Sequence, residues 1–105
     1  MNCNEWPSQT PTLSPEQFLQ RLREIDAYVN NKQVEILSQS HTISSVLNSR
    51  TWPGDSLMWV VRCVQSNKTF SLFANTYHGS SDWNELHTLY EIEQATYQCR
   101  ENSRS

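Results

Sequence analysis

The chain has 105 residues, a formal net charge of −3 at pH 7 and a hydrophobic fraction of 36%. That length fits one domain with its own core, and the low hydrophobic fraction predicts unpacked segments at the chain ends. The acidic balance argues against nucleic-acid binding driven by charge, and no apolar run is long enough to span a bilayer.

Residues 1–13 are predicted to form an unstructured arm, because Pro7 and Pro11 lie among polar residues. Trp6 is the one aromatic residue of this arm, and it either folds back onto the domain or anchors a partner. The N-terminus has neither the basic nor the apolar region of a signal peptide. We therefore expect a cytoplasmic protein, or one in the host cytoplasm if the chain is viral.

The cysteines point to the same compartment. Cys3, Cys63 and Cys99 make an odd count without close spacing, which argues against a disulfide scaffold. Cys63 is interpreted as a small buried apolar residue.

A first helix is predicted from Pro15 to about Asn30. Ser14 has the position of an N-cap, Pro15 follows it, and Gln17 completes a capping box. Apolar residues then recur at helical spacing along one stripe: Phe18, Leu22, Ile25 and Val29.

Two short strands are predicted in residues 33–49, one at 33–37 and one at 41–47. The second contains several Ser and Thr residues, which disfavour a helix interior. The dipeptide Pro53-Gly54 then indicates a type II turn leading into the most apolar part of the chain.

A hairpin is predicted at 57–77, where two runs rich in β-branched and aromatic residues flank a polar break. A two-residue loop at Ser66-Asn67 would pair Cys63 with Phe70 and Trp59 with Ala74, although a longer loop also fits. One face then carries the core residues Leu57, Trp59, Val61 and Cys63. The other face carries Met58, Val60 and Phe73, and it is too apolar to be fully exposed to solvent.

A last helix is predicted from about Ser81 to Arg100, because Asp82 and Glu85 have capping-box spacing. Residues 101–105 are expected to fray. The fold class is therefore α+β, with an N-terminal helix, three to four antiparallel strands centred on the 57–77 hairpin, and a C-terminal helix. Both helices are expected on one sheet face, within a single domain at 14–100.

The residues that could carry chemistry do not form a recognisable motif. His78, Ser80, Ser81 and Asp82 have the chemistry of a catalytic triad, but a strand end followed by a glycine turn and a serine cap explains them better. No histidine or cysteine has metal-ligand spacing, and two glycines cannot build a phosphate loop. The sequence thus predicts no catalytic residue, metal or cofactor.

Two surfaces are candidates for partner binding. Asp82, Glu85, Glu91 and Glu93 give the last helix an acidic character, since no Lys or Arg precedes Arg100 there. The outer sheet face with Met58, Val60 and Phe73 offers apolar area to a partner or to a second copy of the chain. Trp6 is a further candidate anchor.

No motif assigns the chain to a family. Its size and acidity predict a non-enzymatic protein-binding protein, a stoichiometric inhibitor or adaptor that occludes a basic partner such as a nuclease. Phage-type anti-defence and immunity proteins are analogous in size and charge. The alternative is single-stranded nucleic-acid binding through aromatic residues on the sheet, namely Trp52, Trp59, Phe73 and Tyr77. A small hydrolase built around His78 is a third reading.

Overall fold

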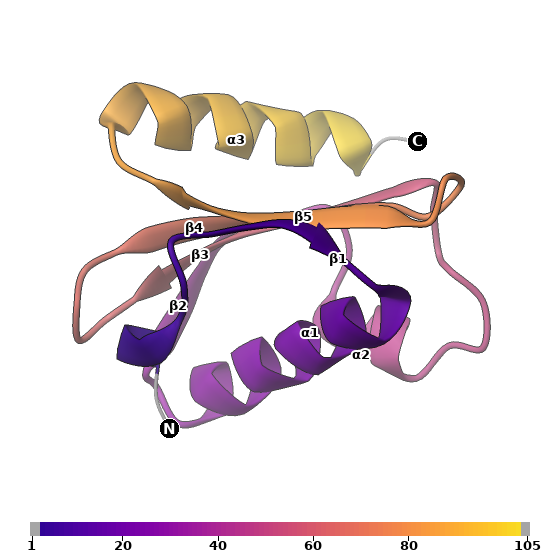
Figure 1. Cartoon of the computed structure of the whole chain (residues 1–105), viewed down its shortest axis with the longest axis horizontal. Coiled ribbons are helices and arrows are strands. Elements are labelled where there is room, and N and C mark those ends of the chain that lie inside the picture. The colour runs from indigo at the N-terminus through magenta and orange to yellow at the C-terminus, as the bar shows by residue number, and fades with distance from the viewer. Residues whose placement is uncertain (1–2, 104–105) are drawn as a thin grey trace.

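The computed structural model describes residues 3–103 and shows a five-stranded antiparallel sheet with helices on both faces (Figure 1). The strands lie in the order β1-β5-β4-β3-β2. The predicted α+β class is confirmed. In chain order the elements are η1 (Cys3–Glu5), β1 (Gln9–Leu13), α1 (Pro15–Asn30), β2 (Val34–Gln39), α2 (Ile43–Leu47), β3 (Ser56–Cys63), β4 (Thr69–Asn75), β5 (Ser80–Leu86) and α3 (Leu89–Asn102).

Helix α1 has the predicted bounds, and its capping box is present. The Ser14 hydroxyl accepts a hydrogen bond from the Gln17 backbone N–H at 3.1 Å, and the Gln17 side chain accepts one from the Ser14 N–H at 2.8 Å. Both orphan donors at the helix start are thereby satisfied. The apolar stripe of α1 faces the sheet through the buried residues Phe18, Leu22 and Ile25.

Strands β3 and β4 form the predicted hairpin in a register shifted by two residues. Trp59 pairs with Leu72 and Val61 with Phe70, whereas a two-residue loop would have paired Trp59 with Ala74. The loop is residues 64–67, closed by a 2.8 Å hydrogen bond from the Asn67 N–H to the Cys63 carbonyl. Because side chains alternate with a period of two, a two-residue shift leaves each of them on its predicted face.

The main core lies between α1 and the sheet. Side chains from all five strands and from α1 and α2 meet there, so the predicted core face of the hairpin is confirmed. The fully buried members with relative exposure of 1% or less include Leu57, Trp59, Val61, Phe70, Leu72 and Trp83 from the sheet, and Phe18, Leu22 and Ile25 from α1.

A second, smaller core lies on the opposite face, under α3. Met58 and Val60 of β3 pack there with Ala95 and Cys99 of α3. Figure 1 shows α3 on one side of the sheet and α1 with α2 on the other. The expectation that both helices share one face is therefore wrong. The outer face of β3 is too apolar to remain in water, and the C-terminal helix covers it.

Residues 80–86 form strand β5, and not the first turns of a helix as predicted. Ser81 and Trp83 are buried on the main-core side, and Asp82 between them points the other way, which is strand periodicity. The last helix starts after Thr88, whose hydroxyl accepts from the Glu91 N–H at 3.1 Å in the true capping box. The spacing of Asp82 and Glu85 imitates that motif.

The segment 33–49 is half strand and half helix. Residues Val34–Gln39 form β2 as predicted, but Ile43–Leu47 form the short helix α2 where a second strand was expected. The Thr42 hydroxyl accepts from the Ser45 N–H at 3.3 Å and caps this helix. The Ser and Thr residues that seemed to disfavour a helix thus act at its start, where they are favourable.

The N-terminal arm is structured, contrary to the prediction. Residues Gln9–Leu13 form the edge strand β1, which pairs with β5, and η1 is tied to β3 by a disulfide between Cys3 and Cys63, with Cα atoms 5.8 Å apart. Cys63 is buried as predicted but is bonded, and the third cysteine, Cys99, is free and buried. At the other end, α3 includes Glu101 and Asn102, and residues 104–105 of the expected frayed tail lie outside the described residues.

Both edge strands of the sheet are irregular. The register of β1 shifts between Thr10 and Leu13, around Pro11, which has no backbone N–H to donate. The register of β2 shifts between Ile36 and Ser38. Such breaks are common in edge strands, where they disrupt the row of exposed backbone groups.

The second core can be tested with two valines near the same face of the hairpin. Val60 is 0% exposed beneath α3, whereas Val64 in the loop is 43% exposed. Val60→Ala should lower the free energy of unfolding in urea melts by about 1.5–3 kcal/mol, the lost burial plus a cavity. Val64→Ala should stay within about 0.5 kcal/mol of the parent. Equal, small effects would mean that α3 does not cover this face.

Candidate partner-binding surface

The four acidic residues expected to form one surface are separated by the fold. Asp82 and Glu85 lie on β5, where Asp82 pairs with Phe73 and Glu85 with Phe70. Three positions apart on a strand, their side chains point to opposite faces of the sheet. Glu91 and Glu93 lie on α3. A single acidic helix face is therefore not formed.

Two of these carboxylates have local structural partners. Glu91 accepts hydrogen bonds from the backbone N–H groups of His87 at 3.2 Å and Thr88 at 3.1 Å, which fixes the start of α3. Glu85 is largely buried, with 12% of its side chain exposed, and lies 3.5 Å from the His87 ring nitrogen. The side chains of Glu85 and Glu91 therefore stabilise the connection between β5 and α3.

Asp82 is half-buried on the α3 side of the sheet. Desolvation by burial raises the pKa of its carboxyl group above the ordinary value. Its charged form is therefore less favourable in the folded protein than in the unfolded chain. A carboxylate in this position is less available to attract a distant partner than one on an open helix surface.

The apolar candidates lie inside the fold. Met58 is 4% and Val60 0% exposed under α3, and Phe73 is partly buried against the same cluster. Trp6 is 9% exposed and packs against Tyr28, Phe70 and Trp83 with ring centroids 5.0–5.6 Å away. Trp6 thus folds back onto the domain, and the expected apolar sheet surface is covered by α3.

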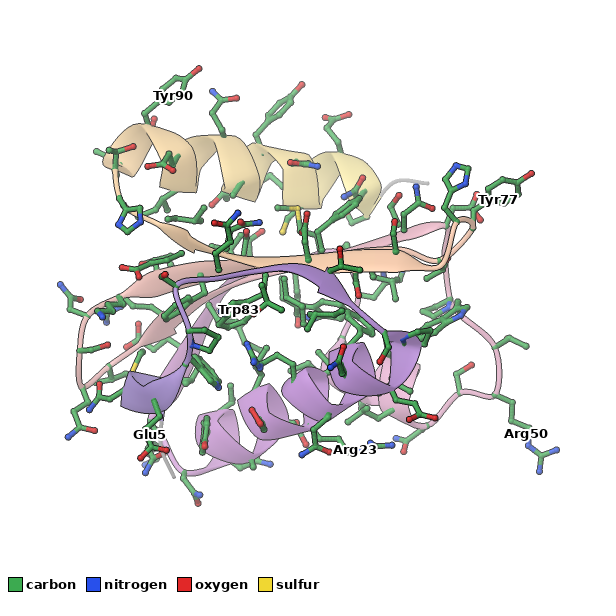
Figure 2. All side chains as sticks on the ribbon, viewed as in Figure 1. Glu5, Arg23, Arg50, Tyr77, Trp83 and Tyr90 are labelled. Carbon is green, nitrogen blue, oxygen red and sulfur yellow. A yellow bond between two sulfur atoms is a disulfide. The ribbon has the colours of Figure 1, made fainter. Side chains whose placement is uncertain are left out.

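The outward face of α3 carries the apolar surface that sequence reasoning missed. Leu89 is 71%, Tyr90 70% and Tyr97 62% exposed. Tyr90 and Tyr97 lie seven residues apart, so they share one helix face, and the exposed Glu93 lies between them. Figure 2 shows Tyr90 pointing away from the sheet. We call Leu89, Tyr90, Glu93 and Tyr97 the α3 outer surface.

A second group of exposed aromatic residues lies at the end of the sheet near the β4–β5 turn. Tyr77 is 80% and Trp52 40% exposed, and the Tyr77 and His78 rings are in contact at 5.0 Å. Next to them is an apolar cleft of about 90 Å³, lined by residues that include Pro15, Phe18, Trp52 and Ala74. Pockets for cofactors or drug-sized ligands are several times larger, roughly 300–1,000 Å³.

The residues around His78 do not converge into a triad. The buried Ser81 hydroxyl donates a hydrogen bond to the Leu13 carbonyl at 3.0 Å, which ties β5 to β1. Asp82 is its neighbour in the strand and points to the opposite face. Within residues 3–103, moreover, no group of three or more His, Cys, Asp or Glu side chains could hold a metal ion.

One serine–histidine pair was not visible in the sequence pattern. The Ser40 hydroxyl lies 2.9 Å from His41 Nδ1 and accepts a hydrogen bond from the Met58 N–H at 2.8 Å. Ser40 is 8% exposed, so its oxygen is withdrawn from solvent and joins the end of β2 to β3. The pair positions the loop before α2, and only the fold could reveal it because Ser40 and Met58 are distant in the chain.

The four aromatic residues considered for nucleic-acid binding do not share a sheet surface. Trp59 is 0% exposed in the main core, and Phe73 is partly buried beside α3. Trp52 and Tyr77 are exposed, but they project from loops at one end of the sheet. Stacking platforms need several rings open to successive bases on one surface.

Comparisons were made with protein-family models, curated proteins and solved structures. None of the three finds a match. Within residues 3–103, no helix combines the length and the apolar character that crossing a membrane would require.

Glu91 and Glu93 offer a direct test of which carboxylate is structural. Glu91→Ala removes the acceptor of two backbone N–H groups, so it should lower the free energy of unfolding by about 1 kcal/mol. Glu93→Ala, on the outward face of the same helix, should change it by less than about 0.5 kcal/mol. Thermal or urea melts of the two variants measure these changes. A larger loss of stability in Glu93→Ala than in Glu91→Ala would contradict the capping geometry.

Asp82 should make the stability depend on pH. Because its pKa is raised in the folded state, the folded protein binds more protons than the unfolded chain between the unfolded and folded pKa values, and stability falls as the pH rises through that window. Asp82→Asn should therefore stabilise the protein at pH 7, and the gain should vanish at acid pH, where both states are protonated. Urea melts across this range test the sign; a destabilising substitution at pH 7 would contradict it.

Proposed function

We propose that this protein is a non-enzymatic binding protein that attaches to another protein through the α3 outer surface. The observation that carries the proposal is the exposure of Leu89, Tyr90 and Tyr97 on a helix whose inner face is already packed. Exposed aromatic side chains have no role in holding α3 on the sheet. Tyrosine is enriched among the residues that dominate binding energy at protein interfaces.

The charge of the chain favours a partner with a basic surface. The formal net charge is −3, and Glu93 lies between the two tyrosines on the α3 outer surface. Carboxylates at the rim of an interface raise the association rate with a basic partner, while aromatic rings that become buried in the complex slow its dissociation. A protein of this size then acts by occlusion, as an inhibitor or adaptor of a target such as a nuclease; phage-type anti-defence and immunity proteins remain the nearest analogy in character.

The non-enzymatic part of the proposal is supported by what the polar side chains do. Ser81 is engaged by the Leu13 carbonyl, Ser40 by the Met58 N–H, and Glu91 by the start of α3. A nucleophile and its base must instead converge on a space that a substrate can reach.

Two earlier expectations about context are revised in this proposal. A homodimer through the outer sheet face would require α3 to leave that face, so we do not propose one. The Cys3–Cys63 disulfide favours an oxidising compartment over the cytoplasm expected from the sequence, because disulfides are rare where thiol reductants are abundant.

The test begins with affinity capture from cells of the native source on the immobilised parent protein, followed by surface plasmon resonance with the purified partner. Tyr97→Ala and Tyr90→Ala should each raise the dissociation rate by roughly tenfold or more, as expected for central interface aromatics. Glu93→Lys should lower the association rate and its dependence on salt, with little change in the dissociation rate.

Tyr77→Ala is the matched control. Tyr77 is as exposed as the α3 tyrosines but lies at the far end of the molecule from Tyr90 in Figure 2. Its substitution should leave both rates unchanged. If the partner binds Tyr90→Ala and Tyr97→Ala like the parent but loses affinity for Tyr77→Ala, the α3 outer surface is not the interface. The interface would then lie at the end of the sheet that carries Trp52 and Tyr77.

A further inference from the structure

The N-terminal segment, residues 3–13, crosses one end of the main core. It starts at Cys3, bonded to Cys63 on β3, and its Trp6 ring then packs against Phe70 of β4 and Trp83 of β5. It ends as β1, paired with β5. Figure 1 shows η1 on the same side of the sheet as α1. The segment therefore spans three strands and closes the space between α1 and the sheet.

Besides the β1–β5 ladder, side-chain hydrogen bonds tie this segment to β5 and α1, among them Ser81 Oγ to the Leu13 carbonyl at 3.0 Å and the Trp6 indole N–H to Glu24 at 3.4 Å. The Trp83 indole N–H donates to the Pro7 carbonyl at 2.8 Å, and the Glu85 N–H donates to the Ser8 carbonyl at 2.7 Å. The β1–β5 ladder is interrupted around Pro11, where no backbone N–H is available. Noncovalent attachment thus depends on the buried Trp6 ring, on these hydrogen bonds and on a short, irregular strand.

The disulfide fastens the Cys3 end of the segment to β3. Leu13 leads directly into α1, so that end is held by the chain itself, and the Cys3 end is held by its bond to Cys63 across a sequence separation of 60. We propose that the Cys3–Cys63 disulfide is a redox-cleavable clasp, and that its reduction allows the N-terminal segment to open as a unit while the remaining sheet and helices stay folded.

The redox step is an ordinary thiol–disulfide exchange with a dithiol reductant. One thiolate of the reductant attacks one sulfur of the disulfide, which breaks the Cys3–Cys63 bond, releases the other cysteine as a thiolate and forms a mixed disulfide with the attacked one. The second reductant thiolate then displaces the protein sulfur. Two electrons and two protons leave the reductant, which becomes a disulfide, and Cys3 and Cys63 become thiols. Because these residues are 1% and 0% exposed, attack must wait for a local opening of the segment.

Opening of the segment has a defined structural consequence. It uncovers the Phe70 and Trp83 rings, which stack with centroids 4.8 Å apart, and the backbone edge of β5. The centre of the sheet keeps its cover, because β3 and β4 remain packed beneath α1 and α3. The segment is therefore suited to act as a local cover whose attachment depends on the thiol environment.

Hydrogen-exchange mass spectrometry on the full chain tests this inference. In the presence of a dithiol such as dithiothreitol, peptides covering residues 3–13 and 80–86 should exchange roughly tenfold faster or more, and peptides within 57–63 and 70–74 should change by less than about twofold. A thiol titration confirms that the reduced protein has gained two thiols. Cys3→Ser should show the same local pattern without reductant.

The control is Cys99→Ala, which removes the free buried thiol and leaves the disulfide intact. This variant should respond to reductant as the parent does. Acceleration of exchange throughout the chain on reduction would show that the disulfide stabilises the whole domain and would overturn the inference. Unchanged exchange in residues 3–13 of the reduced protein would overturn it as well, because the noncovalent contacts would then suffice.

Discussion

The structure depends on one constraint: strand β3 is apolar on both faces. Leu57, Trp59 and Val61 point to one side, Met58 and Val60 to the other, and all five are at most 4% exposed. An antiparallel sheet can leave one face in water only when alternate residues are polar. Here neither face of β3 can do so, and the chain places a helix on each. The three-layer architecture, with α1 and α3 on opposite sides, follows from this strand.

The parts of the fold that local signals determine could be predicted from the sequence. The capping box of Ser14 and Gln17 gave the start of α1, and the apolar stripe at helical spacing up to Val29 gave its length. Alternation of apolar residues in β3 and β4 assigned each side chain to its correct face, even though the loop is longer than two residues and the register differs. Local chemistry decided these features, because a cap and a face need no knowledge of distant residues.

The features that depend on distant contacts could not be predicted. Strand β1 contains Pro11 and few apolar residues, and its conformation comes from pairing with β5. The odd number of cysteines argued against a disulfide, and only the fold shows that Cys3 and Cys63, 60 positions apart, are close enough to bond. The wrong start of the last helix also concealed the exposed tyrosines of the candidate site. A helix that began near Ser81 would place Tyr90 and Tyr97 on the same side as the buried Trp83, but Trp83 belongs to a strand and the two tyrosines face outward.

The two irregular edge strands bear on how the molecule behaves among its own copies. The sheet ends at β1 and β2, and in each of them the ladder is broken, by Pro11 in one case and by the shift between Ile36 and Ser38 in the other. An uninterrupted border would act as a template on which a further chain could lay down a strand. Borders of this kind give a growing fibril no regular surface to extend, so a five-stranded sheet can be maintained in a crowded solution without nucleating cross-β aggregates.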